Sequence, residues 1–193
     1  MKKLLLKKEN IIFVIMFFLL FLVHLPLFIK PIFTADVLLN NSFYNGYSWE
    51  ISLGRFGLYI LGILKSYTSI PSIELILSFL LLIGTSYLLI RLFDIKEKLP
   101  KIFIILFMVL SPIVSATLLF HYCSVGYFLA FFLGVLSVTL YYELKNKYLK
   151  YLLPIICIIV SLSMYQAYLS LIVTTFMIYQ IYLLLHKKNN YKE

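Results

Sequence analysis

Charged residues are scarce in this chain: 13% of its 193 residues are Asp, Glu, Lys or Arg, and 63% are hydrophobic. A soluble domain carries about twice that share of charge, and a soluble fold could not hide so much apolar surface. Several apolar runs approach the roughly 20 residues with which a helix crosses the hydrocarbon layer. Runs such as 11–21 also lack the alternation of membrane β-barrel strands. The sequence therefore predicts an all-α polytopic membrane protein.

Cysteines and the common catalytic motifs are equally sparse. The two cysteines, Cys123 and Cys157, show neither metal-site spacing nor a disulfide framework, and we interpret them as small apolar fillers. The chain has no P-loop, GxGxxG, HExxH, CxxC pair or DxD triplet, and its loops are too short for a nucleotide-binding domain. We therefore predict no metal and no cofactor, and a donor substrate carried by the membrane rather than a free nucleotide.

Acidic residues are also few: eight Asp and Glu stand against 17 Lys and Arg, which leaves a net charge of +9. In a soluble protein this charge would suggest nucleic-acid binding. In a membrane protein the simpler explanation is the enrichment of Lys and Arg in cytoplasmic loops. We therefore predict membrane lipid, and no nucleic acid, as a partner.

Six apolar segments are predicted to span the membrane within a single transmembrane domain, 1–193. The first resembles a signal peptide, but its apolar stretch is longer than usual and lacks a cleavage site, so we expect it to be retained. With six spans, both termini and the two later basic loops face the cytoplasm, which places 14 of the 17 Lys and Arg there. The predicted spans are 11–29, 72–90, 102–120, 125–142, 151–163 and 167–185.

The long external loop, 30–71, contains a further apolar segment at 51–69. A seventh span at this place would put either the N-terminus or the later basic loops on the wrong side of the membrane. The polar residues of the segment recur at three- and four-residue steps, which indicates one polar stripe on a helix. They are Ser52, Arg55, Tyr59, Gly62, Ser66 and Ser69. We predict an amphipathic helix that lies in the membrane interface.

Three external carboxylates, Asp36, Glu50 and Glu74, are candidates for chemistry. A general base for a sugar hydroxyl needs one carboxylate within hydrogen-bonding reach. Asp36 follows the first span closely, where a lipid-linked substrate would present its phosphate; the alternative is a solvated loop acid. Glu50 is the second candidate, and its alternative is a charge favoured by the dipole at a helix start. The same structural explanation is the better one for Glu74.

Arg55 is the candidate for binding the phosphate of a donor. Arg binds phosphate through two parallel hydrogen bonds and stays charged at an interface. It lies in Gly54-Arg55-Phe56-Gly57, where the glycines allow other groups to approach closely. The alternative is that Arg55 extends to lipid headgroups.

Four further residues are candidates for holding a sugar. Trp49 and Tyr47 could stack on a sugar ring, although aromatic residues are also common at the water interface. His121 and Gln166 lie at the outer ends of predicted spans, where they could face the same site. A structural polar group is the alternative for His121, and helix packing is the alternative for Gln166.

Taken in chain order, these motifs resemble the GtrII family of serotype-converting O-antigen glucosyltransferases, which belong to the polytopic GT-C class. The motifs are Thr34-Ala35-Asp36, Trp49, Gly54-Arg55-Phe56-Gly57 and Tyr165-Gln166-Ala167. The resemblance implies an enzyme of the bacterial inner membrane that moves a sugar, typically glucose, from polyprenyl phosphate to a surface polysaccharide or lipopolysaccharide on the outer face. It also implies an inverting displacement. Asp36 would deprotonate the acceptor, Arg55 would stabilise the departing phosphate, and Trp49 would hold a sugar ring.

The chain departs from the family in two ways. Many members carry two adjacent acids where this chain has Asp36 followed by Val37, so Glu50 remains an alternative base. GT-C enzymes also have more spans, so the chain is expected to be an N-terminal portion. Two other functions stay open: a non-catalytic flippase for lipid-linked sugars, which would need polar groups through the depth of the bundle, and a structural membrane subunit or truncated fragment.

Overall fold

The computed structural model describes residues 8–30, 32–39 and 43–189. Within these ranges the regular elements are all α-helices, and the β-structure amounts to one isolated bridge between Tyr44 and Thr68. The helices are α1 Lys8–Val23, α2 Leu25–Ile29, α3 Ala35–Leu39, α4 Ser48–Ser52, α5 Phe56–Leu64, α6 Pro71–Leu92, α7 Lys98–Leu110, α8 Pro112–Leu119, α9 His121–Glu143, α10 Leu149–Met164 and α11 Tyr168–Asn189.

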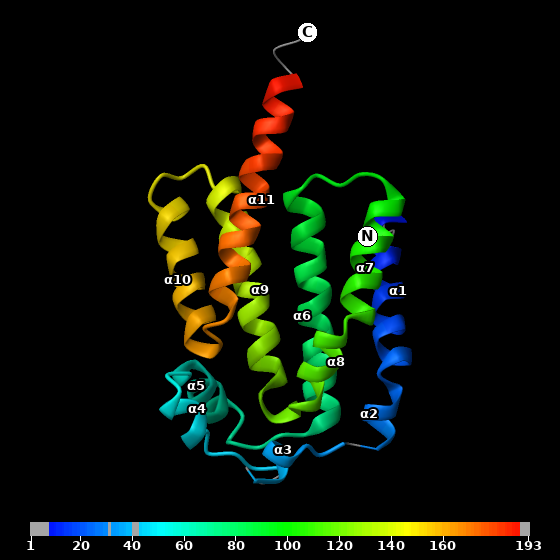
Figure 1. The fold of residues 1–193 in the computed structure, drawn as a ribbon, viewed down its shortest axis with the longest axis vertical. Helices are drawn as coiled ribbons and strands as arrows, with labels where there is room; N and C mark the ends of the chain where they lie inside the picture. The colour runs from blue at the N-terminus through cyan, green and yellow to red at the C-terminus, as the bar shows by residue number, and fades with distance from the viewer. Residues whose placement is uncertain (1–7, 31, 40–42, 190–193) are drawn as a thin grey trace, which may run out of the picture.

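The long helices run up and down through a bundle (Figure 1). Four apolar helical stretches are long enough to cross a membrane, namely α6, α7 with α8, α9, and α11 as far as His186. Two shorter apolar helices, Ile11–Val23 and α10, accompany them. The predicted all-α polytopic membrane fold is confirmed, and each of the six predicted spans corresponds to one helix or to a broken pair of helices.

Proline explains the two breaks in the long helices. Pro26 lies in the first turn of α2, directly after the interruption at His24, and Pro112 opens α8 after Ser111, whose backbone is extended with φ −62° and ψ 125°. Proline has no N–H to donate, so each proline removes one helical hydrogen bond. It also disfavours helical geometry in the residue before it, which here is Ser111 before Pro112. The chain therefore changes direction slightly at both places without leaving the bundle.

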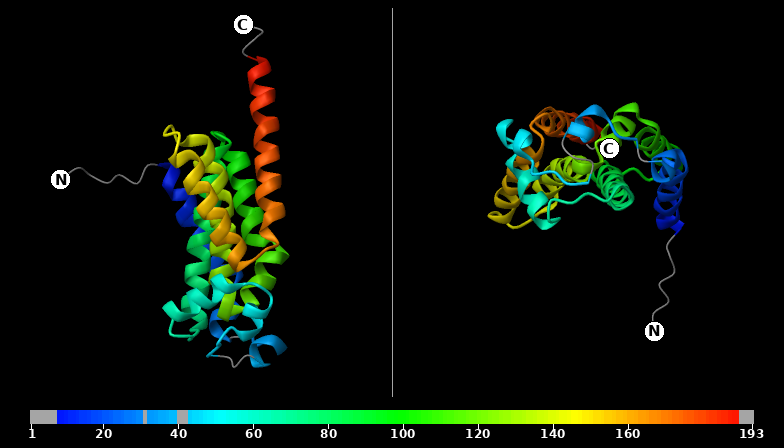
Figure 2. Two further views of the ribbon diagram at one scale, coloured as in Figure 1. Left: turned by 90° about the vertical axis from the view of Figure 1, so that its left-hand side faces the viewer. Right: turned by 90° about the horizontal axis from the view of Figure 1, so that it is seen from below.

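Helix α9 lies at the centre of the bundle. Seen from the end, the helices form a curved row in which α9 and α6 take the middle, with α10 at one end and α1 at the other (Figure 2). Helices α8 and α11 lie on the same side of this row. Small residues allow close helix packing: the hydroxyl of Ser161 in α10 donates to the carbonyl of Ala130 in α9 at 2.7 Å. An apolar cluster around Phe79, Leu82 and Leu118 fills the space between α6, α1 and α8.

The loop segment between α2 and α6 closes one end of the bundle and carries α3, α4 and α5 (Figure 1). The described chain ends and the loops 93–97 and 144–148 lie at the opposite end. Alternating helices thus place the basic loops together, away from the 32–70 segment. Which end faces the cytoplasm stays a prediction from the charge distribution.

The single amphipathic helix predicted over 51–69 is shorter than expected and does not run through the whole segment. The segment forms two helices, α4 and α5, because the backbone turns at Gly54, whose φ of 77° suits glycine. Helix α5 buries Gly57 and Gly62, and it exposes the apolar side chains of Ile60 and Leu64. The glycine face packs against the protein, since a side chain at Gly57 would collide with Ser163 of α10.

Candidate functional site

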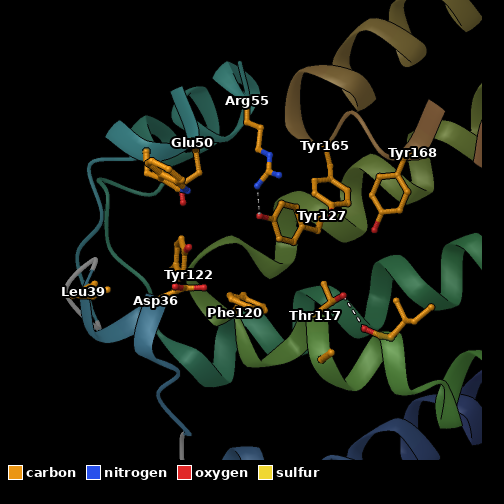
Figure 3. A pocket seen from close by; sticks show the side chains of 13 residues that line it. Asp36, Leu39, Glu50, Arg55, Thr117, Phe120, Tyr122, Tyr127, Tyr165 and Tyr168 are labelled. Carbon is orange, nitrogen blue, oxygen red and sulfur yellow. Dashed lines mark hydrogen bonds between the residues drawn. The ribbon is translucent and has the colours of Figure 1, made fainter. Parts of the chain in front are cut away.

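A pocket of about 770 Å³ lies where the 32–70 segment meets the ends of the spanning helices (Figure 3). It brings together four of the seven predicted site residues, which come from α3, α4 and the start of α5: Asp36, Trp49, Glu50 and Arg55. Helices α8, α9 and α11 and the turn before α11 supply the remaining wall. Those residues are Ile113, Ala116, Thr117, Phe120, Tyr122, Tyr127, Tyr165 and Tyr168, with Leu39 of α3 at the edge.

Arg55 is half-buried and reaches into the pocket from the start of α5 (Figure 3). Its backbone N–H donates to the carbonyl of Glu50 at 2.8 Å, which fixes the turn between α4 and α5. Its side-chain Nη1 donates to the hydroxyl of Tyr127 at 3.1 Å, and its guanidinium carbon lies 4.8 Å from the ring centre of Tyr165. Buried Nε has no hydrogen-bond partner among the described residues. The guanidinium is thus held from one side and keeps a donor available for an anion.

Glu50 lines the same pocket from α4 and is 1% exposed. Its Oε2 has no hydrogen-bond partner within the described part of the chain, and no ion pair joins it to Arg55 there. A buried polar atom without a partner is costly, and such atoms in native proteins usually have a ligand, an ion or a water beside them. Glu50 is therefore poised to accept a hydrogen bond from something bound in the pocket.

Asp36 lies in the first turn of α3 and is exposed at the wall of the pocket, near Tyr122 in the view of Figure 3. The short helix is held by two contacts. The Thr34 hydroxyl accepts a hydrogen bond from the Val37 N–H at 3.4 Å, and the Val37 side chain is fully buried in the cluster that includes Leu58. Burial of Val37 thus fixes the position of α3, so that the neighbouring Asp36 lies at the pocket wall.

Tyrosines form most of the pocket wall opposite the carboxylates. The rings of Tyr127 and Tyr165 have centres 4.7 Å apart, and those of Tyr165 and Tyr168 are 5.2 Å apart in an edge-on arrangement. Trp49, which is 62% exposed, adds a further aromatic surface at the rim. Aromatic faces with polar tips suit a sugar ring, which presents both C–H and O–H groups.

The sequence predicted this tyrosine wall only in part. Tyr165 belongs to the turn motif Tyr165-Gln166-Ala167, and Tyr168 follows that motif directly, so their position carried a signal. Tyr122 lies beside His121 at the end of a predicted span. Nothing in the sequence distinguishes Tyr127 from the other tyrosines of the chain, because its role depends on a contact across 72 residues.

Three predicted sugar-binding residues, Tyr47, His121 and Gln166, are not among the described residues that line the pocket. Tyr47 is 2% exposed and donates its hydroxyl to the carbonyl of Tyr122 at 2.7 Å; burial raises the pKa of this phenol, so it remains a donor at neutral pH. His121 is buried, with Nδ1 3.3 Å from the hydroxyl of Ser69. Gln166 donates to the carbonyl of Leu53 at 3.1 Å. In this structure all three support the loops that shape the pocket.

A partly buried ion pair reinforces the same support. Lys65, at the end of α5, lies 2.7 Å from Oε1 of Glu74 in the first turn of α6, and it also donates to the carbonyl of Tyr122 at 3.0 Å. That carbonyl therefore accepts from both Tyr47 and Lys65. The network joins α5, α6 and α9 directly behind the Tyr122 wall. Glu74 is thus a partner for Lys65 rather than a member of the pocket.

Metal ligands are not gathered at this site. A group of three or more His, Cys, Asp or Glu side chains with suitable geometry does not occur among the residues that the structure describes. The charged groups of the pocket wall are Asp36, Glu50 and Arg55.

A bundle of apolar helices long enough to cross a membrane, with a polar, aromatic pocket under its end loops, defines a polytopic membrane protein with a candidate site at one end of the bundle. A family model described as Glucosyl transferase GtrII matches residues 25–193. The match covers most of the chain and every residue of the pocket, and the chain belongs to this family of membrane glucosyltransferases. No curated protein and no solved structure matches the chain significantly.

Proposed function

We propose that this chain transfers glucose from a polyprenyl-phosphate-linked donor to a hydroxyl of a cell-surface polysaccharide or lipopolysaccharide. Membership of the glucosyltransferase family supports the transferred group. The observation that carries the proposal is the convergence of Asp36, Glu50 and Arg55 with a tyrosine wall in one pocket at the end of the spanning helices. Such a pocket would provide a carboxylate base, a cation to bind the donor phosphate, and an aromatic surface to hold the sugar.

The donor phosphate would bind at Arg55. This guanidinium is already ordered by Tyr127 and Tyr165, while buried Nε lacks a partner in the described structure. A phosphate oxygen at Nε would satisfy this donor with a charge-assisted hydrogen bond. The same contact would strengthen as the phosphate departs with the electron pair of the broken C1–O bond, which is how electrostatic stabilisation speeds such a step.

The acceptor hydroxyl would lose its proton to Asp36. This carboxylate is exposed at the pocket wall, so a large acceptor can approach it from the aqueous side. The acceptor oxygen attacks C1 of the sugar from the face opposite the phosphate, so the configuration at C1 inverts. Glu50 is enclosed, and its unpartnered oxygen suits a hydrogen bond from a hydroxyl of the donor sugar. Glu50 is the alternative base, and the two assignments make different predictions.

The sidedness of the reaction follows from the charge distribution. Basic loops and both described chain ends lie at the end of the bundle away from the pocket (Figure 1). If they face the cytoplasm of a bacterial inner membrane, as the positive-inside rule predicts, the pocket opens on the outer face. A lipid-linked donor fits this location, since free nucleotide sugars are not supplied there.

Polar groups within the spans give little support to a flippase. The buried hydroxyls of Thr85, Ser86 and Thr139 each donate to a carbonyl one turn earlier in their own helix, at 2.8, 2.9 and 3.0 Å. Such bonds satisfy the hydroxyl locally and do not mark a polar path. Asp36, Glu50 and Arg55, which are charged, line the pocket at the loop end.

Transfer of radiolabelled glucose from polyprenyl-phosphate-glucose to surface polysaccharide would test the proposal in membranes that carry the chain. We expect transfer by the parent and none above background by Asp36→Asn or Arg55→Ala. Asp94→Asn is the matched control, because Asp94 lies in the loop at the opposite end, where it pairs with Lys96 at 3.0 Å. No transfer by a correctly inserted parent, with a competent acceptor present, would reject the proposal.

A further inference from the structure

Three tyrosine rings form a row at the loop end of the bundle. They belong to Tyr44, Tyr67 and Tyr59, and we call them the tyrosine row. The ring centres of Tyr44 and Tyr67 lie 5.9 Å apart, and those of Tyr67 and Tyr59 are also 5.9 Å apart. Neighbouring rings are tilted by 59° and 42°, so they do not cover one another, and Tyr44 is 51% exposed. None of the three is among the described residues that line the pocket.

Two loop segments hold the row in place, one before α4 and one after α5 (Figure 1). They meet at the isolated bridge between Tyr44 and Thr68. Beside this bridge, the Asn45 N–H donates to the carbonyl of Tyr67 at 3.0 Å. The rings of Tyr44 and Tyr67 are therefore mounted on backbone segments that are fixed to each other.

The backbone of these two segments is unusual. Ser66 and Tyr67 have φ values of 51° and 56°, and Tyr47 on the other segment has a φ of 56°. Left-handed backbone is uncommon for residues other than glycine and asparagine, because Cβ crowds the neighbouring carbonyl. The fourth such residue among those described, Asp94, lies at the opposite end of the bundle. Strained backbone of this kind concentrates at binding sites, where it fixes a side chain in a required position.

Tyr47 connects the row with the wall of the pocket. A Cβ added at Gly62 would lie 2.5 Å from the Tyr47 ring and 3.3 Å from the Tyr67 ring, so both rings pack against this glycine. The centre of the Tyr47 ring is 6.3 Å from that of Tyr122, which lines the pocket. The row is thus close enough to the pocket for one polymer to reach both.

The chemistry of the row suits a neutral sugar. The charged residue in segments 43–47 and 65–69 is Lys65, whose side chain is 18% exposed. Lys65 lies 2.7 Å from Oε1 of Glu74 and also donates to the carbonyl of Tyr122, so it is not free to bind the phosphate of a lipid headgroup. A tyrosine ring instead offers an apolar face to the C–H groups of a sugar and a hydroxyl to its O–H groups.

We propose that the tyrosine row binds sugar residues of the acceptor polysaccharide next to the residue that is glucosylated in the pocket. This inference rests on the proposed function, because that function supplies the polysaccharide. A polymer with one residue beside Asp36 has to continue outside the pocket, and the row lies at the same end of the bundle. The 5.9 Å between successive rings is comparable with the length of one sugar residue.

Binding of polysaccharide without donor tests the row independently of turnover. The chain is placed in lipid nanodiscs and titrated with fluorescently labelled surface polysaccharide from the cells that encode it. We expect Tyr44→Ala to weaken binding about tenfold, equivalent to ~1.4 kcal/mol. Tyr44→Trp keeps a ring at this position and should bind like the parent. Unchanged binding by Tyr44→Ala, which is the result expected if the row contacts membrane lipid alone, would overturn the inference.

Phe43→Ala is the matched control. Phe43 is 56% exposed, which is close to the value for Tyr44, but its ring pairs with that of Phe33 at 5.9 Å. We expect Phe43→Ala to bind the polysaccharide like the parent. Equal weakening by Phe43→Ala and Tyr44→Ala would show that both substitutions disturb the loop, and it would also overturn the inference.

Kinetic measurements separate this inference from the proposed function. We expect Tyr44→Ala to raise the KM of the polysaccharide, and to leave unchanged the KM of the donor and that of the shortest acceptor fragment that the parent glucosylates. If the KM of polysaccharide and fragment change equally, the row is not a sugar site, although the transfer itself stands. If the parent transfers glucose to neither acceptor, the proposed function fails. Polysaccharide binding that depends on Tyr44 would then still establish the row as a sugar site.

Discussion

The hydroxyl of Tyr127, in the middle of the chain, accepts a hydrogen bond of 3.1 Å from Nη1 of Arg55, in the loop segment. This bond joins the central helix α9 to the start of α5 and aims the guanidinium into the pocket (Figure 3). The position of the Arg55 side chain therefore depends on helix α9, and the sequence around Arg55 does not reveal this contact. The bond therefore gives Tyr127 a role in positioning Arg55.

Replacing Tyr127 with Phe should weaken donor binding more than it slows the chemical step. The ring and its contact with Tyr165 remain, but Arg55 loses its acceptor. A hydrogen bond to a charged group contributes about 1.5–3 kcal/mol, so we expect the donor KM to rise about tenfold or more with a smaller change in kcat. Tyr148→Phe is the control, since Tyr148 is 82% exposed at the opposite end. Equal effects of both variants would refute this role for Tyr127.

Gly57 sets the distance between α5 and α10. A Cβ at this position would lie 2.3 Å from the Ser163 hydroxyl and 3.0 Å from the Ser163 backbone carbon, so α5 would have to move. We expect Gly57→Ala to destabilise the fold by about 1–3 kcal/mol and to reduce transfer, because Arg55 begins the same helix. Gly46→Ala should do neither, since no atom lies within 4 Å of the added carbon. Thermal unfolding in detergent, with a transfer assay beside it, measures both effects.

The sequence predicted the fold class and the pocket's polar residues, because both leave local signals. Apolar runs mark the spans, and charged residues of the loop such as Asp36, Glu50 and Arg55 are conspicuous in so apolar a chain. It could not show that α5 turns its glycines inward, since that depends on Ser163, more than 100 residues away. For the same reason the sequence could not show that Tyr47, His121 and Gln166 do not line the pocket: it places them near the pocket but does not say which way they face.

Lys65→Met should destabilise the protein because it leaves the carboxylate of Glu74 without its ion-pair partner. Glu74 is 3% exposed, and its Oε1 would lose its ion-pair partner at 2.7 Å. Breaking one side of a buried pair costs about 3–5 kcal/mol, whereas removing both sides with apolar residues is often close to neutral. We therefore expect Lys65→Met with Glu74→Leu to recover much of the lost stability. If the double variant is no more stable than the single one, the bond from Lys65 to the Tyr122 carbonyl is the more important contact.

Val37 directly follows Asp36, where the resemblance described above leads us to expect a second acid, and it is 0% exposed. An aspartate placed there would enter the apolar cluster around Leu58 instead of the pocket. We expect Val37→Asp to lose at least about 2 kcal/mol of stability, the cost of burying an unpaired polar group, and to lower rather than raise transfer. The neighbouring Leu38 is 62% exposed, and Leu38→Asp should be tolerated. Higher transfer by Val37→Asp would show that the acid pair can form here.

Kinetic measurements on variants can distinguish the roles of the two pocket carboxylates, Asp36 and Glu50. Asp36 is exposed to an incoming acceptor, while Glu50 is enclosed beside the Arg55 turn. If Asp36 is the base, Asp36→Asn should lower kcat about 10²–10⁴-fold, the usual contribution of general base catalysis, with little change in the donor KM. Glu50→Gln keeps its size and a hydrogen-bonding oxygen, so it should raise the donor KM and lower kcat far less.

The opposite pattern would assign the base to Glu50. In that case Glu50→Gln would abolish turnover, while Asp36→Asn would mainly weaken the acceptor. Measuring donor binding by competition, in the absence of acceptor, decides between the two, because a base variant still binds the donor. Asp36→Asn membranes that bind polyprenyl-phosphate-glucose with the parent affinity, yet transfer nothing even at saturating acceptor, would place proton removal at Asp36.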